Sequence, residues 1–272
     1  MRRRRAWRGG TSLSPLDAAL LGLVQGLTEF LPVSSSGHLV VVEALLGVHE
    51  EGILFEVAVH VATLLAVVVF YRARVASLAL GAVRGDPAAW RYGLKLGVAT
   101  LPAIAAVLVA RDAFEGLYES IAPVGLALWV TGAVVYSTRW TLPRASGEEP
   151  GWADALWIGI AQAVAIVPGV SRSGATVSTA LALGVAPAAA AEFSFMMSLP
   201  AIVGAVVLQI PELGSVAPGA WKELAVGGAA ALASGLAALW LFVRLLRSQA
   251  FHRFAWYVWP VGALVLIWAR MR

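Results

Sequence analysis

The chain has 272 residues, of which 60% are hydrophobic and 13% are charged. Because soluble domains carry about 25% charged residues, the 20 Lys and Arg and 16 Asp and Glu side chains are too few to cover a soluble core of this size. Together with a mean hydropathy of +0.80, this composition excludes a soluble globular protein. The absence of cysteine excludes disulfides, thiolate catalysis and cysteine-ligated zinc.

The formal net charge of +4 does not indicate a nucleic-acid partner. Five arginines lie among the first eight residues, and most other basic residues flank apolar runs. Anionic lipid head groups attract such basic flanks. We therefore expect contact with membrane lipids and not with nucleic acid, and we assign residues 1–12 to a basic N-terminal tail that precedes a single membrane domain over residues 13–272.

Eight apolar stretches follow the tail. Six of them have about the length needed to span hydrocarbon: Ile53 to Tyr71, Leu94 to Ala110, Ala122 to Thr138, Ala188 to Ile210, Leu224 to Leu246 and Trp256 to Ala269. The other two, Leu16 to Leu46 and Ala155 to Val185, are interrupted by Pro32-Val-Ser-Ser-Ser-Gly37 and Pro168-Gly-Val-Ser-Arg-Ser-Gly174. Backbone groups without hydrogen-bond partners occur at membrane depth only inside protein or beside a water-filled cavity. We therefore predict an all-α protein with six transmembrane helices and two re-entrant broken-helix hairpins.

The two broken stretches are similar to each other. Aligning Gln25 with Gln162 also aligns a Pro, a Val, two Ser and a Gly, with small gaps. An acidic residue opens the next span in both halves, Glu56 in the first and Glu192 in the second. We infer an internal repeat, with repeat one over 13–140 and repeat two over 152–270. An odd number of crossings in each half makes this an inverted repeat, whose two serine-rich turns meet near the membrane midplane.

The basic residues set the orientation. One face of this topology receives ten of them and the other face four, so the first face is expected in the cytoplasm. The ten are Arg72, Arg74, Arg84, Arg91, Lys95, Arg139, Arg144, Arg244, Arg247 and Arg253, and the four are Arg111, Lys222, Arg270 and Arg272. The N-terminal arginines oppose this assignment, because the same topology places both termini outside.

Charged groups inside apolar segments are costly and are functional candidates. At the first break, Gln25 and Glu29 share one helix face, Ser34 and Ser35 follow in the turn, and His38 comes directly afterwards. A carboxylate, hydroxyls and an imidazole supply a base or metal ligand, a nucleophile and an acid–base group. The alternative is a buried strut in which Glu29 pairs with the arginine of the second break.

The second break has the pattern of an anion site. Arg172 lies between Ser171 and Ser173, Gly174 follows, and Thr176 opens the next helix. Backbone N–H groups at a helix N-terminus attract phosphate, and a guanidinium matches phosphate oxygens. We expect Arg172 to bind phosphate, the alternative being a structural, ion-paired arginine. Glu56, His60 and Glu192 are expected either to orient these groups or to be buried hydrogen-bonded struts.

These motifs carry a family resemblance. The runs Gln25-Gly-Leu-Thr-Glu-Phe-Leu-Pro-Val-Ser-Ser-Ser-Gly-His38 and Pro168-Gly-Val-Ser-Arg-Ser-Gly-Ala-Thr176, followed by Glu192-Phe-Ser-Phe195, resemble the paired motifs of the undecaprenyl-diphosphate phosphatase family, also known as bacitracin-resistance proteins. The resemblance covers about Leu16 to Ala269. It implies a multi-pass plasma-membrane enzyme that hydrolyses the C55 polyprenyl diphosphate carrier to the monophosphate and inorganic phosphate. That reaction recycles the carrier for peptidoglycan synthesis and confers bacitracin resistance, from an active site that opens to the outer face.

The resemblance also implies roles for individual residues. Catalysis falls on Glu29, Ser35, His38 and Arg172, and phosphate binding on Ser34, Ser171, Ser173, Gly174 and Thr176. A divalent cation, Mg²⁺ or Ca²⁺, is expected as cofactor with Glu29 and Gln25 as candidate ligands. Many members have Glu at position 25 and Gln at position 60. A neutral Gln25 is the weaker ligand for a hard cation, and His60 adds a titratable group.

The resulting hypothesis is that Arg172 and the turn N–H groups bind the terminal phosphate while Ser35 attacks in line, with Glu29 as base or metal ligand and His38 as acid–base partner. Direct attack by water is the alternative mechanism. A polyprenyl-phosphate flippase or transporter is the alternative function, since it would use the same inverted repeat. The run Ser36-Gly37-His38 also resembles an element of the phosphatidic-acid phosphatase superfamily, but Ser178 stands where that family has a second histidine.

Overall fold

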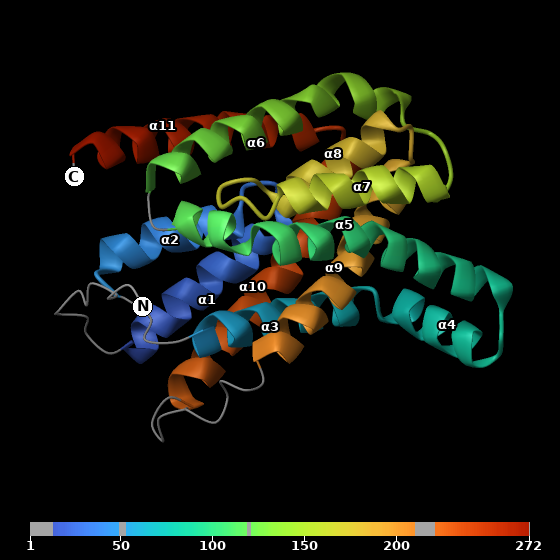
Figure 1. The fold of residues 1–272 in the computed structure, drawn as a ribbon, viewed down its shortest axis with the longest axis horizontal. Coiled ribbons are helices and arrows are strands. Elements are labelled where there is room, and N and C mark those ends of the chain that lie inside the picture. Colours follow the sequence, from blue (N-terminus) through green and yellow to red (C-terminus); the bar gives the residue numbers. More distant parts are fainter. Residues whose placement is uncertain (1–12, 49–52, 119–120, 210–220, 272) are drawn as a thin grey trace.

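The computed structural model describes residues 13–48, 53–118, 121–209 and 221–271, whose regular secondary structure is helical apart from one isolated bridge between Gly147 and Val185. Figure 1 shows the arrangement of the helices. The first half contains α1 (Pro15–Phe30), α2 (Ser35–Leu46), α3 (Ile53–Phe70), α4 (Arg72–Val83), α5 (Pro87–Tyr118) and α6 (Ile121–Thr141), followed by the short η1 (Leu142–Arg144). The second half contains α7 (Trp152–Val164), α8 (Arg172–Ala182), α9 (Pro187–Gln209), α10 (Trp221–Arg247), the short η3 (Phe251–Phe254) and α11 (Ala255–Met271).

The apolar helices confirm the predicted all-α membrane fold. Five helical segments of the described residues are long and apolar enough to cross a membrane, and they correspond to all or most of α5, α6, α9, α10 and α11. A sixth is obtained if α3 and α4 count as one span, although the two helices meet at an angle of 82°. α5 starts at Pro87 and not at the predicted Leu94, because Asp86 accepts a hydrogen bond from the backbone N–H of Ala88 at 3.0 Å and proline suits a first helical turn.

Both predicted breaks are present in the structure. α1 ends at Phe30 because the next residue, Leu31, precedes Pro32, and a residue before proline is pushed out of the helical region. α7 ends at Val164, and Pro168 lies in the open segment before α8. Each break is therefore a stretch of non-helical backbone between two short apolar helices, as the proline positions predict.

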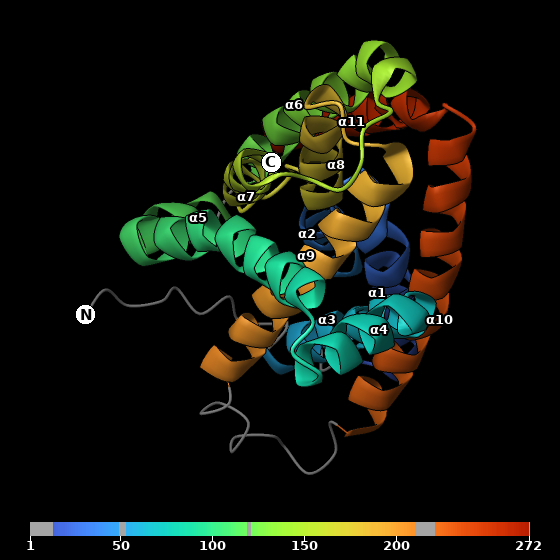
Figure 2. The ribbon, with the colours of Figure 1, turned by 90° about the vertical axis from the view of Figure 1, so that its right-hand side faces the viewer.

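The two halves pack against each other reciprocally. α1 of the first half lies along α10 of the second, and α7 of the second half lies along α5 of the first. α6 and α11, the last helix of each half, pack side by side along one edge (Figure 1). Figure 2 shows α10 along another edge, with α1 on its inner side. The first helix of each half thus packs on the other half.

Repeat-related glycines allow these close approaches. A Cβ on Gly22 of α1 would lie 2.1 Å from the carbonyl oxygen of Gly227 in α10, and a Cβ on Gly159 of α7 would lie 2.4 Å from the carbonyl oxygen of Ala99 in α5. Gly22 and Gly159 each precede the aligned glutamine, Gln25 or Gln162, by three residues. Small residues let membrane helices approach closely, so both breaks are held against a long helix of the other half.

Candidate active site

The two breaks present helix N-termini with the same capping hydrogen bonds. The hydroxyl of Ser34 accepts a hydrogen bond from the N–H of Gly37 at 3.3 Å, and that of Ser171 accepts one from the N–H of Gly174 at 3.1 Å. Each capping hydroxyl also lies 3.3 Å from the hydroxyl of the serine two residues later. α2 and α8 therefore begin in the same way, with Ser35 and Arg172 as their respective first residues.

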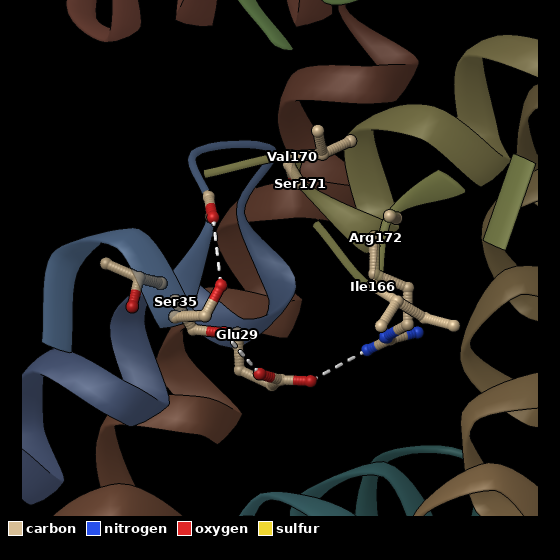
Figure 3. Close-up of a pocket in the computed structure, with 10 residues that line it drawn as sticks. Glu29, Ser35, Ile166, Val170, Ser171 and Arg172 are labelled. Atoms are coloured by element: carbon tan, nitrogen blue, oxygen red, sulfur yellow. Dashed lines mark hydrogen bonds and ion pairs between the residues drawn. The ribbon is translucent and has the colours of Figure 1, made fainter. Parts of the chain in front are cut away.

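These two first residues meet at Glu29, in the last turn of α1. The Ser35 hydroxyl donates to Oε2 of Glu29 at 2.6 Å, and the Arg172 guanidinium donates to Oε1 at 2.9 Å. Figure 3 shows Ser35 and Arg172 reaching the carboxylate from different sides. Side-chain exposure is only 7% for Glu29 and 18% for Arg172, so this ion pair is shielded from solvent. A carboxylate is thereby placed to accept a proton from a serine and to neutralise an arginine.

A cavity of about 170 Å³ adjoins this constellation. Its polar lining comes from α1 and from the two capped turns, and its apolar lining from the end of α7 and the turn that follows. The lining residues are Thr28, Glu29, Ser34, Ser35, Ser36, Ala165, Ile166, Val170, Ser171 and Arg172. Two helix N-termini therefore face the same cavity, and their N–H groups and dipoles favour a bound anion.

Three contacts fix the second turn. Thr131 of α6 accepts from the N–H of Ser171 at 3.0 Å and donates to the carbonyl of Gly169 at 2.8 Å. Gly169 has a φ of +98°, and a Cβ there would lie 2.5 Å from the carbonyl oxygen of Val124. The Ser173 hydroxyl donates to the carbonyl of Leu31 at 3.2 Å and so ties the second turn to the first.

Thr176 supports the arginine from α8. Its hydroxyl donates to the carbonyl of Arg172 at 2.8 Å and lies 2.6 Å from the hydroxyl of Ser194 in α9. The carbonyl of Ser194 also accepts from the Arg172 guanidinium at 3.4 Å. Thr176, Ser173 and Gly174 thus act on the shape of the turn and do not line the cavity.

The remaining residues predicted at the first break, Gln25 and His38, do not line the cavity. Gln25 is buried, and its amide N–H donates to Oε2 of Glu29 at 3.1 Å. Nδ1 of His38 lies 2.8 Å from the carbonyl oxygen of Ser34, and Nε2 lies 2.9 Å from the hydroxyl of Tyr257 in α11. In this geometry the partner of the Ser35 hydroxyl is Glu29, and both nitrogens of His38 are bonded elsewhere.

Glu56, His60 and Glu192, which are predicted to orient the site, lie in different surroundings. His60 lies on α3, and its Nδ1 lies 2.7 Å from the carbonyl oxygen of Glu56. Glu56 itself is exposed on α3. Glu192 accepts from the Nε of Arg74 at 2.8 Å, and Arg74 also pairs with Glu149. Glu192 thus belongs to an ion-pair network that joins α4, α9 and the loop after α6.

The residues fit a divalent cation that takes most of its ligands from substrate oxygens. Among the described residues, no group of three or more His, Asp or Glu side chains gathers as a protein cage would require. Glu29 already accepts from Gln25, Ser35 and Arg172. The Oε1 of Gln25, however, is buried without a hydrogen-bond partner in the described structure. Carboxylate and amide oxygens suit Mg²⁺ or Ca²⁺, and Mg²⁺ commonly takes its other ligands from phosphate and water.

Three side chains of the site are not among the residues predicted from the sequence. Thr131 and Tyr257 lie in ordinary apolar spans and belong to neither serine-rich motif, and Thr28 lines the cavity one residue before Glu29. The two breaks carried a local signal, because proline, glycine and serine interrupt an apolar run there. For Thr131 and Tyr257 the signal is spatial alone, since each contacts a turn far away along the chain.

Comparison with known proteins identifies the family of the chain. The family model described as bacitracin resistance protein BacA matches residues 18–264. The chain is similar to proteins named undecaprenyl-diphosphatase from Syntrophotalea carbinolica (40% identical, covering 93% of this chain and 98% of the relative) and Rubrobacter xylanophilus (41%, covering 93% and 97%). A third, from Salinibacter ruber, is 40% identical and covers 92% and 97%. The chain, with its two capped breaks and its apolar helices, belongs to the bacitracin resistance protein BacA family.

Proposed function

We propose that this protein is an undecaprenyl-diphosphate phosphatase that releases inorganic phosphate from the polyprenyl diphosphate and leaves the monophosphate. The observation that carries the proposal is the meeting of Ser35 and Arg172 at Glu29 beneath two helix N-termini. The names of the relatives give the substrate class, and the membrane helices suit a lipid carrier. The product would return to the synthesis of peptidoglycan, and removal of the diphosphate accounts for bacitracin resistance.

The terminal phosphate of the substrate binds in the cavity between the two turns. The Arg172 guanidinium uses one donor for Glu29 and another for Ser194, so its other N–H groups can reach phosphate oxygens. The N-termini of α2 and α8 add backbone N–H donors and the positive ends of two helix dipoles. Phosphoryl transfer depends mostly on positioning and charge neutralisation, and this cavity supplies both.

The Ser35 oxygen attacks the terminal phosphorus, and its proton passes to Glu29, which already accepts that hydroxyl at 2.6 Å. The bond from phosphorus to the bridging oxygen breaks, and the polyprenyl monophosphate leaves with the proton that Glu29 held, which restores the carboxylate. Water then attacks the phosphoserine and gives a proton to Glu29. The bond from phosphorus to the serine oxygen breaks, Glu29 returns the proton to that oxygen, and Ser35 and inorganic phosphate are released. Arg172 stays beside the transferred group throughout, where it stabilises charge on the equatorial oxygens.

A divalent cation belongs to the proposal as cofactor. Glu29 and the unpartnered Oε1 of Gln25 would hold it, together with oxygens of the substrate. When bound, Mg²⁺ or Ca²⁺ neutralises negative charge on the diphosphate. The protein is further proposed to lie in the plasma membrane with its cavity open to the outer face, since the basic regions that contain Arg74 in α4 and Arg139 at the end of α6 indicate the cytoplasmic side.

Release of phosphate by the purified protein in detergent tests the function. We expect C55 polyprenyl diphosphate to be hydrolysed and a soluble diphosphate such as pyrophosphate to be a poor substrate, since the apolar helices add binding energy for the lipid alone. Chelation should stop the reaction, and Mg²⁺ or Ca²⁺ should restore it. If the purified protein binds the lipid diphosphate but releases no phosphate with either cation, the phosphatase proposal is wrong and the flippase alternative gains support.

A further inference from the structure

His38 is bonded through both ring nitrogens, and neither bond leads to the attacking serine. Nδ1 lies 2.8 Å from the backbone carbonyl oxygen of Ser34, and because a carbonyl only accepts, Nδ1 carries the hydrogen. In the neutral ring Nε2 is then an acceptor, so the Tyr257 hydroxyl, 2.9 Å away, donates to it. The two rings are stacked, with an interplanar angle of 12° and centroids 5.8 Å apart.

The backbone group that His38 holds is conformationally strained. Ser34 has a φ of +70°, a value that non-glycine residues adopt rarely and at a cost. Its carbonyl accepts twice from residue 38, from the backbone N–H at 3.2 Å and from Nδ1 of the ring. Ser35 is the next residue, and its hydroxyl lies 2.6 Å from Glu29. The conformation of Ser34 therefore sets the direction in which the Ser35 hydroxyl points.

α11 packs against this strained turn. Val33, which precedes Ser34, is buried in one apolar cluster with Val258, the neighbour of Tyr257 on α11. The hydroxyl of Tyr257 and the side chain of Val258 thus bring the last helix of the protein against the turn that carries the serine. A chain of contacts runs from Tyr257 to His38, from His38 to Ser34, and from there to Ser35.

The second break lacks this support and has no need of it. Ser171 occupies the place of Ser34 but has an ordinary φ of −74°. Ala175 stands where the first break has His38, and Thr131 holds the turn through backbone groups. A histidine strut is therefore present only at the turn that is strained and that presents the nucleophile.

We propose that Tyr257 is a positioning residue for the phosphatase reaction, acting through His38. The tyrosine fixes the ring so that Nδ1–H holds the Ser34 carbonyl, and this keeps the Ser35 hydroxyl directed at Glu29. His38 then acts as a strut of the nucleophile turn and exchanges no proton with Ser35. The inference rests on the proposed function, because its readout is the rate of phosphate release.

The first test removes the tyrosine hydroxyl and keeps the ring. Tyr257→Phe should lower kcat about tenfold, the cost of one lost hydrogen bond expressed in the transition state, and should change KM by less than about threefold. The matched control is Tyr136→Phe, which removes a hydroxyl that accepts from Arg139 on a ring that packs against Trp256 of α11. That control should keep wild-type kinetics. Both variants are checked for unchanged thermal unfolding in detergent.

The second test separates a strut from an acid–base group at position 38. An asparagine side chain places its N–H near the position of Nδ1, whereas glutamine places it near Nε2. His38→Asn should therefore retain kcat within about tenfold of wild type, while His38→Gln and His38→Ala should lose about 10²-fold, since misplacement of a reacting group costs that much. The pH profile of His38→Asn should keep the wild-type shape. Adding Tyr257→Phe to His38→Ala should cause no further loss, because both changes remove the same support.

Three results would overturn the inference. They are wild-type kcat in folded Tyr257→Phe, equal losses in the asparagine and glutamine variants with one limb of the pH profile missing, and fully additive losses in the double variant. Failure of the proposed function has a different signature, since wild-type protein itself would then release no phosphate.

Discussion

Three donors share the carboxylate of Glu29: the amide of Gln25, the hydroxyl of Ser35 and the guanidinium of Arg172. The cluster resembles a buried strut, because the ion pair alone would hold α1 against α8. A strut, however, needs neither the serine hydroxyl on the second oxygen nor the adjoining cavity with two helix N-termini. The arrangement at residue scale is therefore that of a site which binds and transfers an anion.

Replacing Glu29 with glutamine tests its role as base. Glu29→Gln keeps the shape of the side chain but removes the charge that takes the proton from Ser35, so phosphate release should fall by about 10²-fold or more. Glu149→Gln, which alters an exposed carboxylate paired with Arg74, should remain within about twofold, since surface ion pairs contribute little. Activity of Glu29→Gln within a few-fold of wild type would remove Glu29 from the chemistry.

The shape of the Arg172 side chain is tested by a change that preserves its charge. Arg172→Lys removes the planar guanidinium, which donates to Glu29 and Ser194 and is proposed to bind phosphate at the same time. This change should lower kcat/KM about tenfold or more. Arg172→Ala should lower turnover by about 10²-fold. As a control, Arg139→Lys changes an exposed arginine whose partner is Tyr136 and should have no effect. Equal activity of the lysine and wild-type proteins would mean that charge alone suffices.

The sequence predicts Glu29, Ser35 and Arg172 as site residues because charged groups in apolar segments are costly and stand out. The short distance between His38 and Ser35 along the chain predicts an acid–base pair, whereas the structure bonds the ring to Ser34 and Tyr257. That partner follows from the packing of α11 against the first break, which no local pattern encodes. Glu192 likewise pairs with Arg74, a contact between helices far apart along the chain.

At the scale of elements, proline and serine positions predicted both breaks. Pro32 ends the helical backbone of α1, Pro168 lies in the non-helical segment after α7, and Ser34 and Ser171 cap the helices that follow. The bend of 82° between α3 and α4 was not predicted. No proline or glycine lies at that bend, where Tyr71 separates the two helices. The bend therefore depends on tertiary packing and leaves no signal in hydropathy.

The close approach of α1 and α10 gives a prediction about stability. Gly22→Ala would place a Cβ 2.1 Å from a backbone carbonyl oxygen, so the helices must separate at a cost of about 1–3 kcal/mol. We expect a lower unfolding temperature in detergent and reduced activity, since α1 carries Glu29. Gly97→Ala on α5 meets no atom within 4 Å and should not lower the unfolding temperature. Equal behaviour of the two variants would contradict the packing of α1 on α10.

Across the whole molecule, the helices of each half pack reciprocally on the other half, and the site lies between the two breaks. The ion pairs that Arg74 forms with Glu149 and Glu192 join two basic regions, residues 72–95 and the loop after α6. The proposed orientation places both regions on the same face of the membrane. The site is therefore made jointly by both halves, because Glu29 and Ser35 come from the first and Arg172 from the second.

Orientation is measurable because the chain has no cysteine. Single cysteines can replace Ala88, exposed beside the basic loop before α5, and Lys222, exposed at the start of α10. In intact cells a membrane-impermeant maleimide should label Lys222→Cys and not Ala88→Cys, whereas both should react after lysis. The reverse pattern would place the basic loops outside and contradict the proposed orientation.

The most direct measurement of the central claim is rapid-quench trapping with polyprenyl diphosphate labelled in its terminal phosphate. If Ser35 attacks with Glu29 as its base, the label should appear transiently on the peptide that contains Ser35. The labelled peptide should be absent from Ser35→Ala. In any variant that hydrolyses the phosphoserine more slowly, the label should persist longer on that peptide. Release of labelled phosphate at the full rate with no labelled Ser35 at any time would contradict the account and show that water attacks directly.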